Sequence, residues 1–220
     1  MESSRRQHSA EKQKKTKVKQ RPYHHGDLRK ALLDAALEIL AKEGESELTL
    51  REVARRAGVT HAAPYRHFPN KEALLASVAE EGFRMLVRHV DEARAGVTDP
   101  ALRLQTAGVG YVMFAVSHPI HFRVMFRAVQ ASGASFPSLA EAGAAAFSQL
   151  LESVVECQQA GVVVRGEPRE LAISAWAIVH GLASLLMDNC LGPTPPNVTP
   201  TTLAMQVNAH LMQGLRPRSA

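Results

Sequence analysis

The stretch Thr49–Lys71 constrains this 220-residue chain more than any other, because its residues predict two short helices joined by a tight turn. Thr49 predicts an N-cap, and Glu52, three residues later, predicts the reciprocal bond of a capping box. Gly58 predicts the turn, since glycine adopts a positive φ without steric cost. Thr60 predicts the cap of a second helix. This is the pattern of a helix-turn-helix, whose second helix enters the DNA major groove, although similar helix pairs also occur in proteins that bind no DNA.

The positive charge of the chain is concentrated in its first part. The formal net charge is +5, but residues 1–90 hold 18 Lys and Arg against 12 Asp and Glu, whereas residues 91–220 hold 8 against 9. A basic module joined to a nearly neutral one predicts a polyanion partner for the first module only. Residues 1–22 carry eight basic residues and almost no large apolar side chains, so we expect a disordered arm. Two roles stay open for it: contact with DNA phosphates or a minor groove, and a solubilising tail.

Beyond the arm, the sequence predicts an all-α fold of about nine helices, because apolar residues recur at helical spacing and no segment alternates as a strand does. Residues 71–95 predict a long helix that connects the helix-turn-helix to the rest of the chain. Residues 168–191 predict a helix that is apolar over most of its circumference, which indicates burial on two sides. We therefore expect three parts: the arm at 1–22, a DNA-binding domain at 23–72 and a second domain at 73–220.

The sequence lacks the motifs of enzymes and of metal sites. No Gly-rich phosphate loop, His-Glu-x-x-His zinc motif or nucleophile elbow occurs. His118 and His121 have the spacing of metal ligands but no acidic or cysteine partner, so we interpret them as polar residues at a helix boundary. Cys157 and Cys190 lie in apolar stretches and are expected to be buried, reduced thiols. We therefore expect no catalytic residues, no cofactor and no metal.

Targeting signals are also missing from the sequence. The N-terminus is charged throughout and has no apolar core of a secretory signal. No apolar run reaches the ~18 residues of a membrane span. We therefore expect a cytoplasmic protein without a membrane partner.

Two stretches resemble the tetracycline-repressor (TetR) family of regulators. The first, within residues 28–75, contains L-T-L-R-E-V-A-R-R-A-G-V and the highly specific run Y-x-H-F-x-N-K-E-x-L-L. The second, W-x-x-x-H-G at Trp176–Gly181, resembles one regulatory-domain subgroup of that family. The resemblance implies an all-helical homodimer that binds a palindromic operator in double-stranded DNA. It also implies a C-terminal domain that binds a small-molecule effector and dimerises through its last two helices, so that the effector releases a repressor from DNA.

The resemblance also implies which residues contact DNA. They lie in and around the helix-turn-helix and are Thr49, Arg51, Thr60, His61, Ala62, Ala63, Tyr65, Arg66, His67 and Lys71. Tyr65, His67 and Lys71 match family positions that hold phosphates. Thr49 and Arg51 match positions of the first helix that touch the backbone or a base.

The segment that reads the bases departs from the family pattern in having Ala62, Ala63 and Pro64. These residues leave few side chains that pair with base edges. Direct readout then rests on His61 and Arg66, with methyl contacts from the alanines.

Large apolar side chains predict where an effector binds. Six of them lie on helices expected to meet in the second domain: Phe114, Phe122, Met125, Phe126, Phe147 and Trp176. We expect a mainly apolar ligand among them, with Tyr111 and His180 supplying its few polar contacts. The alternative is plain core packing, in which case the chain is a DNA-binding dimer without ligand control. A third hypothesis, an enzyme with an accessory DNA module, is disfavoured because the second domain has neither paired carboxylates nor a nucleophile constellation.

Overall fold

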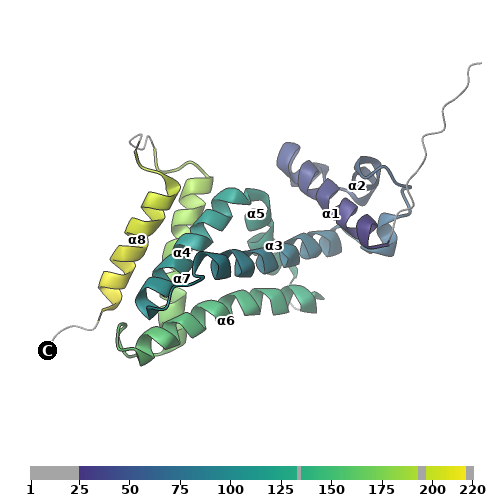
Figure 1. The fold of residues 1–220 in the computed structure, drawn as a ribbon. Coiled ribbons are helices and arrows are strands. Elements are labelled where there is room, and N and C mark those ends of the chain that lie inside the picture. Colours follow the sequence, from purple (N-terminus) through teal and green to yellow (C-terminus); the bar gives the residue numbers. More distant parts are fainter. Residues whose placement is uncertain (1–24, 133–134, 193–196, 217–220) are drawn as a thin grey trace, which may run out of the picture.

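The computed structural model describes residues 25–132, 135–192 and 197–216, and these residues form an all-α fold without strands (Figure 1). Its eight α-helices are α1 His25–Lys42, α2 Leu50–Arg56, α3 Lys71–Ala93, α4 Pro100–Ser117, α5 Pro119–Ser132, α6 Pro137–Gln159, α7 Pro168–Met187 and α8 Pro200–Leu215. Two 3-10 turns are η1 Glu45–Glu47 and η2 Pro64–Arg66. The predicted fold class is confirmed, and η2 stands where the ninth helix was expected. The arm predicted at 1–22 lies outside the described residues.

The first half of the helix-turn-helix forms as its capping residues predict. α2 begins after Thr49, whose Oγ1 accepts a hydrogen bond from the Glu52 N–H at 3.1 Å. Gly58 has a φ of 68°, which few other residues adopt without strain. The N–H of Val59 then donates to the Ala54 carbonyl at 3.0 Å and closes the helix end. Local capping chemistry therefore determines where the chain turns toward residues 60–66. We call these residues the reading segment, because the resemblance implies that they read the DNA bases.

The second half of the motif is shorter than the sequence predicts. Thr60 does not cap an α-helix, because residues 61–63 form a turn and only Pro64–Arg66 are helical, as a single 3-10 turn. Pro64 has no N–H to donate to the Thr60 carbonyl, so the first bond of the predicted α-helix cannot form. The N–H of Ala63 donates to that carbonyl instead, at 2.9 Å. The reading segment is therefore a turn followed by η2.

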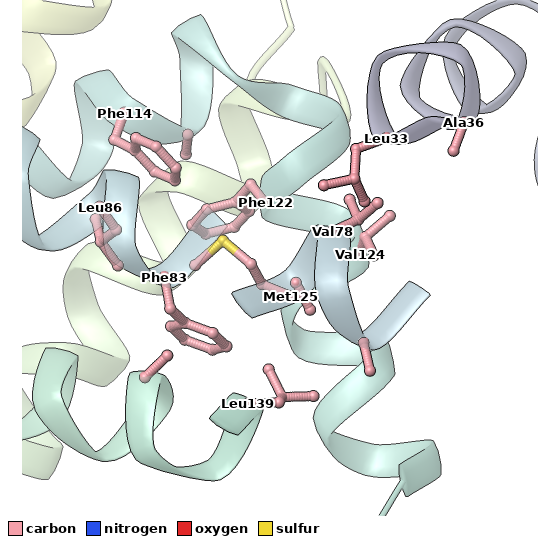
Figure 2. Close-up of a cluster of buried hydrophobic side chains, with 14 of the residues drawn as sticks. Leu33, Ala36, Val78, Phe83, Leu86, Phe114, Phe122, Val124, Met125 and Leu139 are labelled. Atoms are coloured by element: carbon pink, nitrogen blue, oxygen red, sulfur yellow. The ribbon is translucent and has the colours of Figure 1, made fainter. Parts of the chain in front are cut away.

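α3 connects the helix-turn-helix to the helices that follow. Figure 1 shows it running from the α1 and α2 end of the molecule into the bundle of later helices. It packs against α1 and, more extensively, against α4, α5 and α6. Buried side chains continue from α1 through α3 to α5, where Leu33, Val78 and Val124 lie together (Figure 2). The apolar core is thus continuous across residue 72.

A glycine allows α3 and α5 to approach closely. A Cβ atom at Gly82 would lie 2.6 Å from the Sδ atom of Met125, which is fully buried. Figure 2 shows Met125 between Phe83 and Phe122, in the space between the two helices. Any side chain at Gly82 would have to displace Met125, so the glycine sets the distance between α3 and α5.

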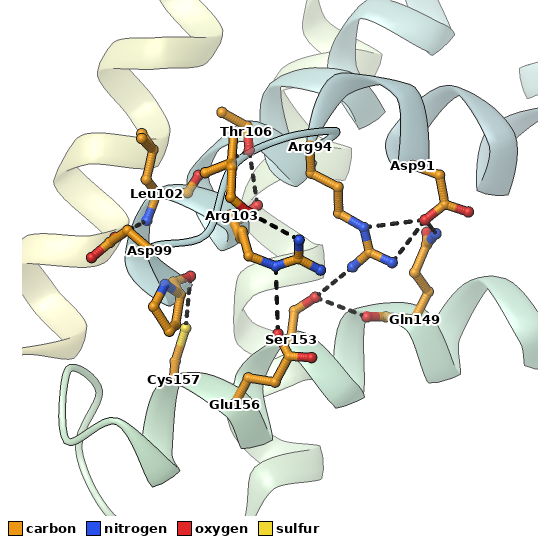
Figure 3. Close-up of polar contacts among 12 residues, drawn as sticks. Asp91, Arg94, Asp99, Leu102, Arg103, Thr106, Gln149, Ser153, Glu156 and Cys157 are labelled. Carbon is orange, nitrogen blue, oxygen red and sulfur yellow. Dashed lines mark hydrogen bonds and ion pairs between the residues drawn. The ribbon is translucent and has the colours of Figure 1, made fainter.

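Two sets of contacts hold the far end of the bundle: a polar network, which Figure 3 shows, and a second apolar cluster. Arg94 donates to Asp91 at 2.8 Å and to the Ser153 hydroxyl at 3.1 Å, while the Gln149 amide donates to Asp91 at 2.8 Å. The apolar cluster consists of Leu104, Val154, Cys157, Val163, Ala172, Met212 and Leu215. These contacts join the C-terminal end of α3 to α6 and join α4 to α6, α7 and α8.

α7 ends at Met187, before the predicted residue 191, because Asn189 adopts a φ of 53° outside the helical region. Of the described helices, α7 alone is long and apolar enough to cross a membrane by length and composition. The helix contains Arg169, Glu170 and His180, so it is not an unbroken apolar run of ~18 residues. One such helix is weak evidence for a membrane span, since the test considers length and composition only; α7 packs against α4, α6 and α8 on one side, and 28% of the tested window is buried.

Candidate nucleic-acid interface and internal cavity

The predicted DNA contacts lie around α2, the following turn and η2. Seven of them are exposed, namely Thr49, Arg51, Thr60, His61, Ala62, Tyr65 and Arg66, whereas Ala63, His67 and Lys71 are half-buried. Tyr65 exposes 58% of its surface. A tyrosine ring held in solvent on a short turn has little packing role, and such amphipathic side chains are typical of contacts with a partner.

The Glu52 carboxylate departs from the predicted capping box. It accepts hydrogen bonds from Arg55 at 2.7 Å and from Arg56 at 3.0 Å, and Arg56 also contacts Glu43. Two charge-assisted bonds outweigh the single bond to the backbone N–H of Thr49 that a capping box needs. The Arg55 hydrogen bond also holds the pKa of the Glu52 carboxyl below its usual value. These two arginines are therefore engaged within the fold.

Arg51 and Arg66 differ from those neighbours. Both are exposed, and neither forms an ion pair with another residue of the described ranges. A guanidinium group carries five N–H donors in a planar fork that matches phosphate oxygens or the edge of guanine. The structure thus separates two arginines that support the helix-turn-helix from two that present donors to solvent.

Two of the predicted phosphate contacts also take part in the fold. The Lys71 ammonium donates to the Glu45 carbonyl at 2.7 Å, which ties the start of α3 to η1. It keeps two further N–H donors for a phosphate. The Nε2 atom of His67 is buried and has no hydrogen-bond partner among the described residues, so only the other ring nitrogen is left for a phosphate. Both side chains are thus less free than their sequence positions suggest.

A cavity of about 580 Å³ lies among α3, α4, α6 and α7, with contributions from α5 and α8. Small-molecule sites typically measure roughly 300–1,000 Å³. The wall is mostly apolar, and the face of α6 toward it is rich in small residues, which include Ala140, Gly143, Ala144 and Ala146. Short side chains on one helix leave the space that larger ones would fill.

Four of the eight predicted ligand contacts line this cavity, namely Tyr111, Phe126, Phe147 and Trp176. Phe114, Phe122 and Met125 do not: each is at most 3% exposed and packs in the core between α3, α4 and α5 (Figure 2). The structure therefore places these three residues in the packed core, as the core-packing alternative expects, and outside the wall of this cavity. Met125 and Phe126 are roughly 100° apart around α5, so Met125 packs against α3 whereas Phe126 reaches the cavity wall.

Tyr111, Trp176 and His180 form a chain of hydrogen bonds. The Trp176 N–H donates to the Tyr111 hydroxyl at 3.1 Å, and that hydroxyl lies 2.8 Å from Nδ1 of His180. Burial lowers the pKa of His180, which favours the neutral ring, and an Nδ1 atom without a proton can accept a hydrogen bond from the Tyr111 hydroxyl. Burial raises the pKa of Tyr111 well above its usual value, which keeps the hydroxyl protonated. Tyr111 and His180 are thus occupied with each other, and His180 is not part of the cavity wall, in contrast to its predicted role.

The cavity wall also contains three polar residues that were not predicted from the sequence: Gln149, Arg169 and Asn208. Asn208 is 2% exposed and donates from its amide to a carbonyl of its own helix at 2.8 Å. Arg169 precedes two other wall residues of α7, Ile173 and Trp176, by four and seven positions. Residues with that spacing lie on one face of a helix, so the sequence could have placed Arg169 beside Trp176.

The cysteines and histidines form no group of three potential metal ligands in the described part of the chain. Cys157 is buried, as predicted; its Sγ lies 3.2 Å from the Pro100 carbonyl, and burial raises its pKa to about 11. Cys190 is exposed, contrary to prediction, because it lies beyond the end of α7. His118 is the C-cap residue of α4, at the helix boundary where it was expected.

Two family models match this chain. The model for bacterial regulatory proteins of the tetR family matches residues 32–78, and the model for the tetracyclin repressor-like C-terminal domain matches residues 104–207. The chain belongs to the TetR family. Proteins of the TetR family are transcription regulators with a DNA-binding helix-turn-helix, are typically dimers with small-molecule effectors, and are generally not enzymes. The first match contains the exposed surface described above, and the second contains most of the cavity wall.

Solved structures share this TetR-family fold. A protein of unknown function from Rhodococcus sp. RHA1 is 32% identical, with a TM-score of 0.79, covering 90% of this chain and 100% of that one. A bacterial regulatory protein in the tetR family from Rhodococcus RHA1 is 18% identical, with a TM-score of 0.69 and coverage of 87% and 98%. The fatty acid degradation regulator FadR from Bacillus halodurans is 20% identical, with a TM-score of 0.71 and coverage of 89% and 100%. The last two comparisons show the fold alone.

Proposed function

We propose that this TetR-family protein is a ligand-responsive repressor that binds a palindromic operator as a dimer and is released by a small, mainly apolar molecule in the cytoplasm. The observation that carries the proposal is the course of α3. Lys71 at its start belongs to the candidate DNA surface, and Phe83, Leu86 and Val90 further along line the cavity. A ligand that binds one orientation of α3 better than another shifts the equilibrium between DNA-binding and released forms.

The proposal divides the chain as the sequence suggests, into a DNA-binding domain at 23–72 and a ligand-binding and dimerisation domain at 73–220. α3 belongs to both parts mechanically, because its apolar contacts continue from α1 to α5 and α6. A tilt of α3 inside the second domain therefore moves the reading segment of the first. In a dimer, two reading segments must lie about 34–36 Å apart to enter successive major grooves, so a small tilt in each copy changes DNA affinity.

Exposed apolar side chains on α7 and α8 support the dimer. Ile178 and Leu185 of α7 and Met205 of α8 are 40%, 44% and 58% exposed. Paired with the same helices of a second copy, they would form a four-helix interface. We expect Ile178→Glu to yield monomers in sedimentation at micromolar concentration, whereas Ala145→Glu, at an exposed position of α6, leaves the dimer intact. A wild-type monomer at that concentration would contradict this part of the proposal.

The DNA-binding half of the proposal is tested at Arg66. An operator is first selected from a random duplex pool with the full-length protein. We expect Arg66→Ala to weaken binding to that operator by about 1–3 kcal/mol and binding to random duplex by much less, because an arginine on guanine discriminates bases. Arg165→Ala, an exposed arginine of the second domain, serves as the control. Equal losses on both duplexes would show that Arg66 contacts phosphate only.

The ligand half is tested by filling the cavity. Gly143 lines it, and a Cβ atom there lies in ordinary contact distance of the Phe83 ring, at 3.8 Å. Gly143→Leu therefore places a side chain into the space, whereas Ala145→Leu on the same helix does not line it. A ligand found by thermal-shift screening should stabilise the control and not Gly143→Leu. If no ligand alters operator binding by the wild-type protein, the chain is a DNA-binding dimer without ligand control.

A further inference from the structure

The charge of the cavity wall is confined to one side chain. Of the described residues that line the cavity, Arg169 alone carries a charge, and no carboxylate accompanies it. The rest of the wall is mostly apolar, apart from Tyr111, Gln149 and Asn208. A cavity of this composition suits a ligand with a long apolar part and one polar end.

The Arg169 side chain is held at the wall but not neutralised there. Its guanidinium carbon lies 5.0 Å from the centroid of the Phe147 ring, which also lines the cavity. This cation–π contact orients the guanidinium and uses none of its N–H donors. Arg169 is exposed and forms no ion pair among the described residues. Glu167 accepts a hydrogen bond from the backbone N–H of Arg169, at 3.4 Å, and neither Glu167 nor Glu170 lines the cavity.

The other polar groups of the wall already have partners. The Gln149 amide donates to the Val87 carbonyl at 3.2 Å and to Asp91 at 2.8 Å. The Tyr111 hydroxyl is engaged with Trp176 and His180, and the Asn208 amide donates within α8. The strongest donors left for a ligand are therefore those of Arg169.

We propose that the cavity takes an amphiphile with an apolar body and a single carboxylate, which the Arg169 guanidinium binds at the N-terminal end of α7. The planar fork of one arginine matches a carboxylate through two parallel hydrogen bonds. A phosphate ester carries more charge, for which the described wall provides no second cation. A cationic amphiphile is repelled by Arg169, and a neutral one can accept a hydrogen bond from it but forms no charge-assisted pair. This inference rests on the proposed function, because it specifies the class of ligand for the same cavity.

The single tryptophan of the chain, Trp176, lines the cavity and reports binding through its fluorescence. Decanoate, decan-1-ol and decylamine have the same chain length and differ in the charge of one end. With the full-length protein we expect decanoate to bind at least about fivefold more tightly than the other two, in line with a partly exposed ion pair. Arg169→Gln should remove this preference, and Arg169→Lys should keep part of it. Arg165→Gln makes the same charge change outside the wall and should keep all of it.

The outcomes separate this inference from the function on which it rests. Equal binding of decanoate and decanol, or a preference that survives Arg169→Gln, overturns the carboxylate assignment. If decanol nevertheless releases the protein from the operator, the proposed ligand control holds without the carboxylate assignment. Binding of decanoate with the expected preference supports the assignment even where operator affinity does not change, and that result counts against ligand control alone. Failure of all three probes to change Trp176 fluorescence overturns the inference, while Gly143→Leu tests ligand control independently.

Discussion

The helix-turn-helix and the cavity use aromatic side chains in opposite ways. Phe68, directly after η2, is 1% exposed and belongs to the main apolar core. Phe147 of α6 is only partly buried and has the cavity on one side. The first ring fills a core that holds exposed side chains such as Tyr65 and Arg66 in place. The second ring borders a space, so its neighbours have room to rearrange. A rigid reading end and a less densely packed regulatory end are what a ligand-controlled DNA-binding protein needs.

The largest effect that tests this contrast is a pair of truncations. We expect Phe68→Ala to lower the free energy of unfolding by about 3–5 kcal/mol, because it creates a new hole in a filled core. Phe147→Ala should lower it by about 1–2 kcal/mol, since the ring already lacks packing partners on its cavity side. Urea unfolding followed by circular dichroism measures both. Comparable losses would mean that the helices around Phe147 are as well packed as the helix-turn-helix core.

A second contrast concerns two tyrosines. Tyr111→Phe removes the hydroxyl that joins Trp176 to His180 and leaves two partly buried polar groups without their partner. We expect a loss of about 1–3 kcal/mol in the free energy of unfolding. Tyr65→Phe should stay within ~0.5 kcal/mol of the wild type, because its hydroxyl lies on an exposed surface. The effects on operator affinity should have the opposite order. Tyr65→Phe should weaken operator binding directly, whereas Tyr111→Phe should weaken it only through the loss of folded protein. A stable Tyr111→Phe protein would show that the chain of hydrogen bonds does not support the wall.

The smallest expected effect is a pH dependence of the second domain. Burial lowers the pKa of His180 and of His121, the latter with opposing contributions from Glu81 and Asp34. The unfolded chain then binds protons at a higher pH than the folded one, so stability is full above the ordinary histidine pKa of 6.5 and falls as pH drops through it. We therefore expect the free energy of unfolding to decrease between pH 7 and pH 5.5.

The contribution of His180 to this dependence is separable. His180→Gln keeps an acceptor for the Tyr111 hydroxyl but does not titrate. The variant should show a shallower fall in stability over the same pH range, with the remainder due to His121 and other groups. If the free energy of unfolding of His180→Gln decreases as steeply as that of the wild type, groups other than His180 cause the pH dependence. A rise in stability on acidification would contradict the direction of both pKa shifts.

Local chemistry in the sequence determined where most helices begin and where the chain turns. Asp99, Glu167 and Thr199 each precede a proline and cap α4, α7 and α8, as their order predicts. Gly58 adopts the positive φ that the turn requires. These features depend on groups within a few residues of one another, so the sequence contains all the information they need. The family resemblance of the helix-turn-helix is of the same kind, because its residues follow one another directly.

The tertiary structure alone decided which side chains are free and which are engaged. Lys71 reaches a carbonyl 26 residues earlier in the chain, and Met125 and Phe126, adjacent in sequence, point into the core and into the cavity. Helical spacing places Arg169 on one face with Ile173 and Trp176, but only the tertiary structure shows its guanidinium over the Phe147 ring of α6. A cavity is the volume that several helix faces together do not fill, and no local pattern records that difference. The sequence by itself therefore determined the fold class and the first half of the helix-turn-helix, whereas the packing of distant helices determined the cavity wall and which side chains are engaged.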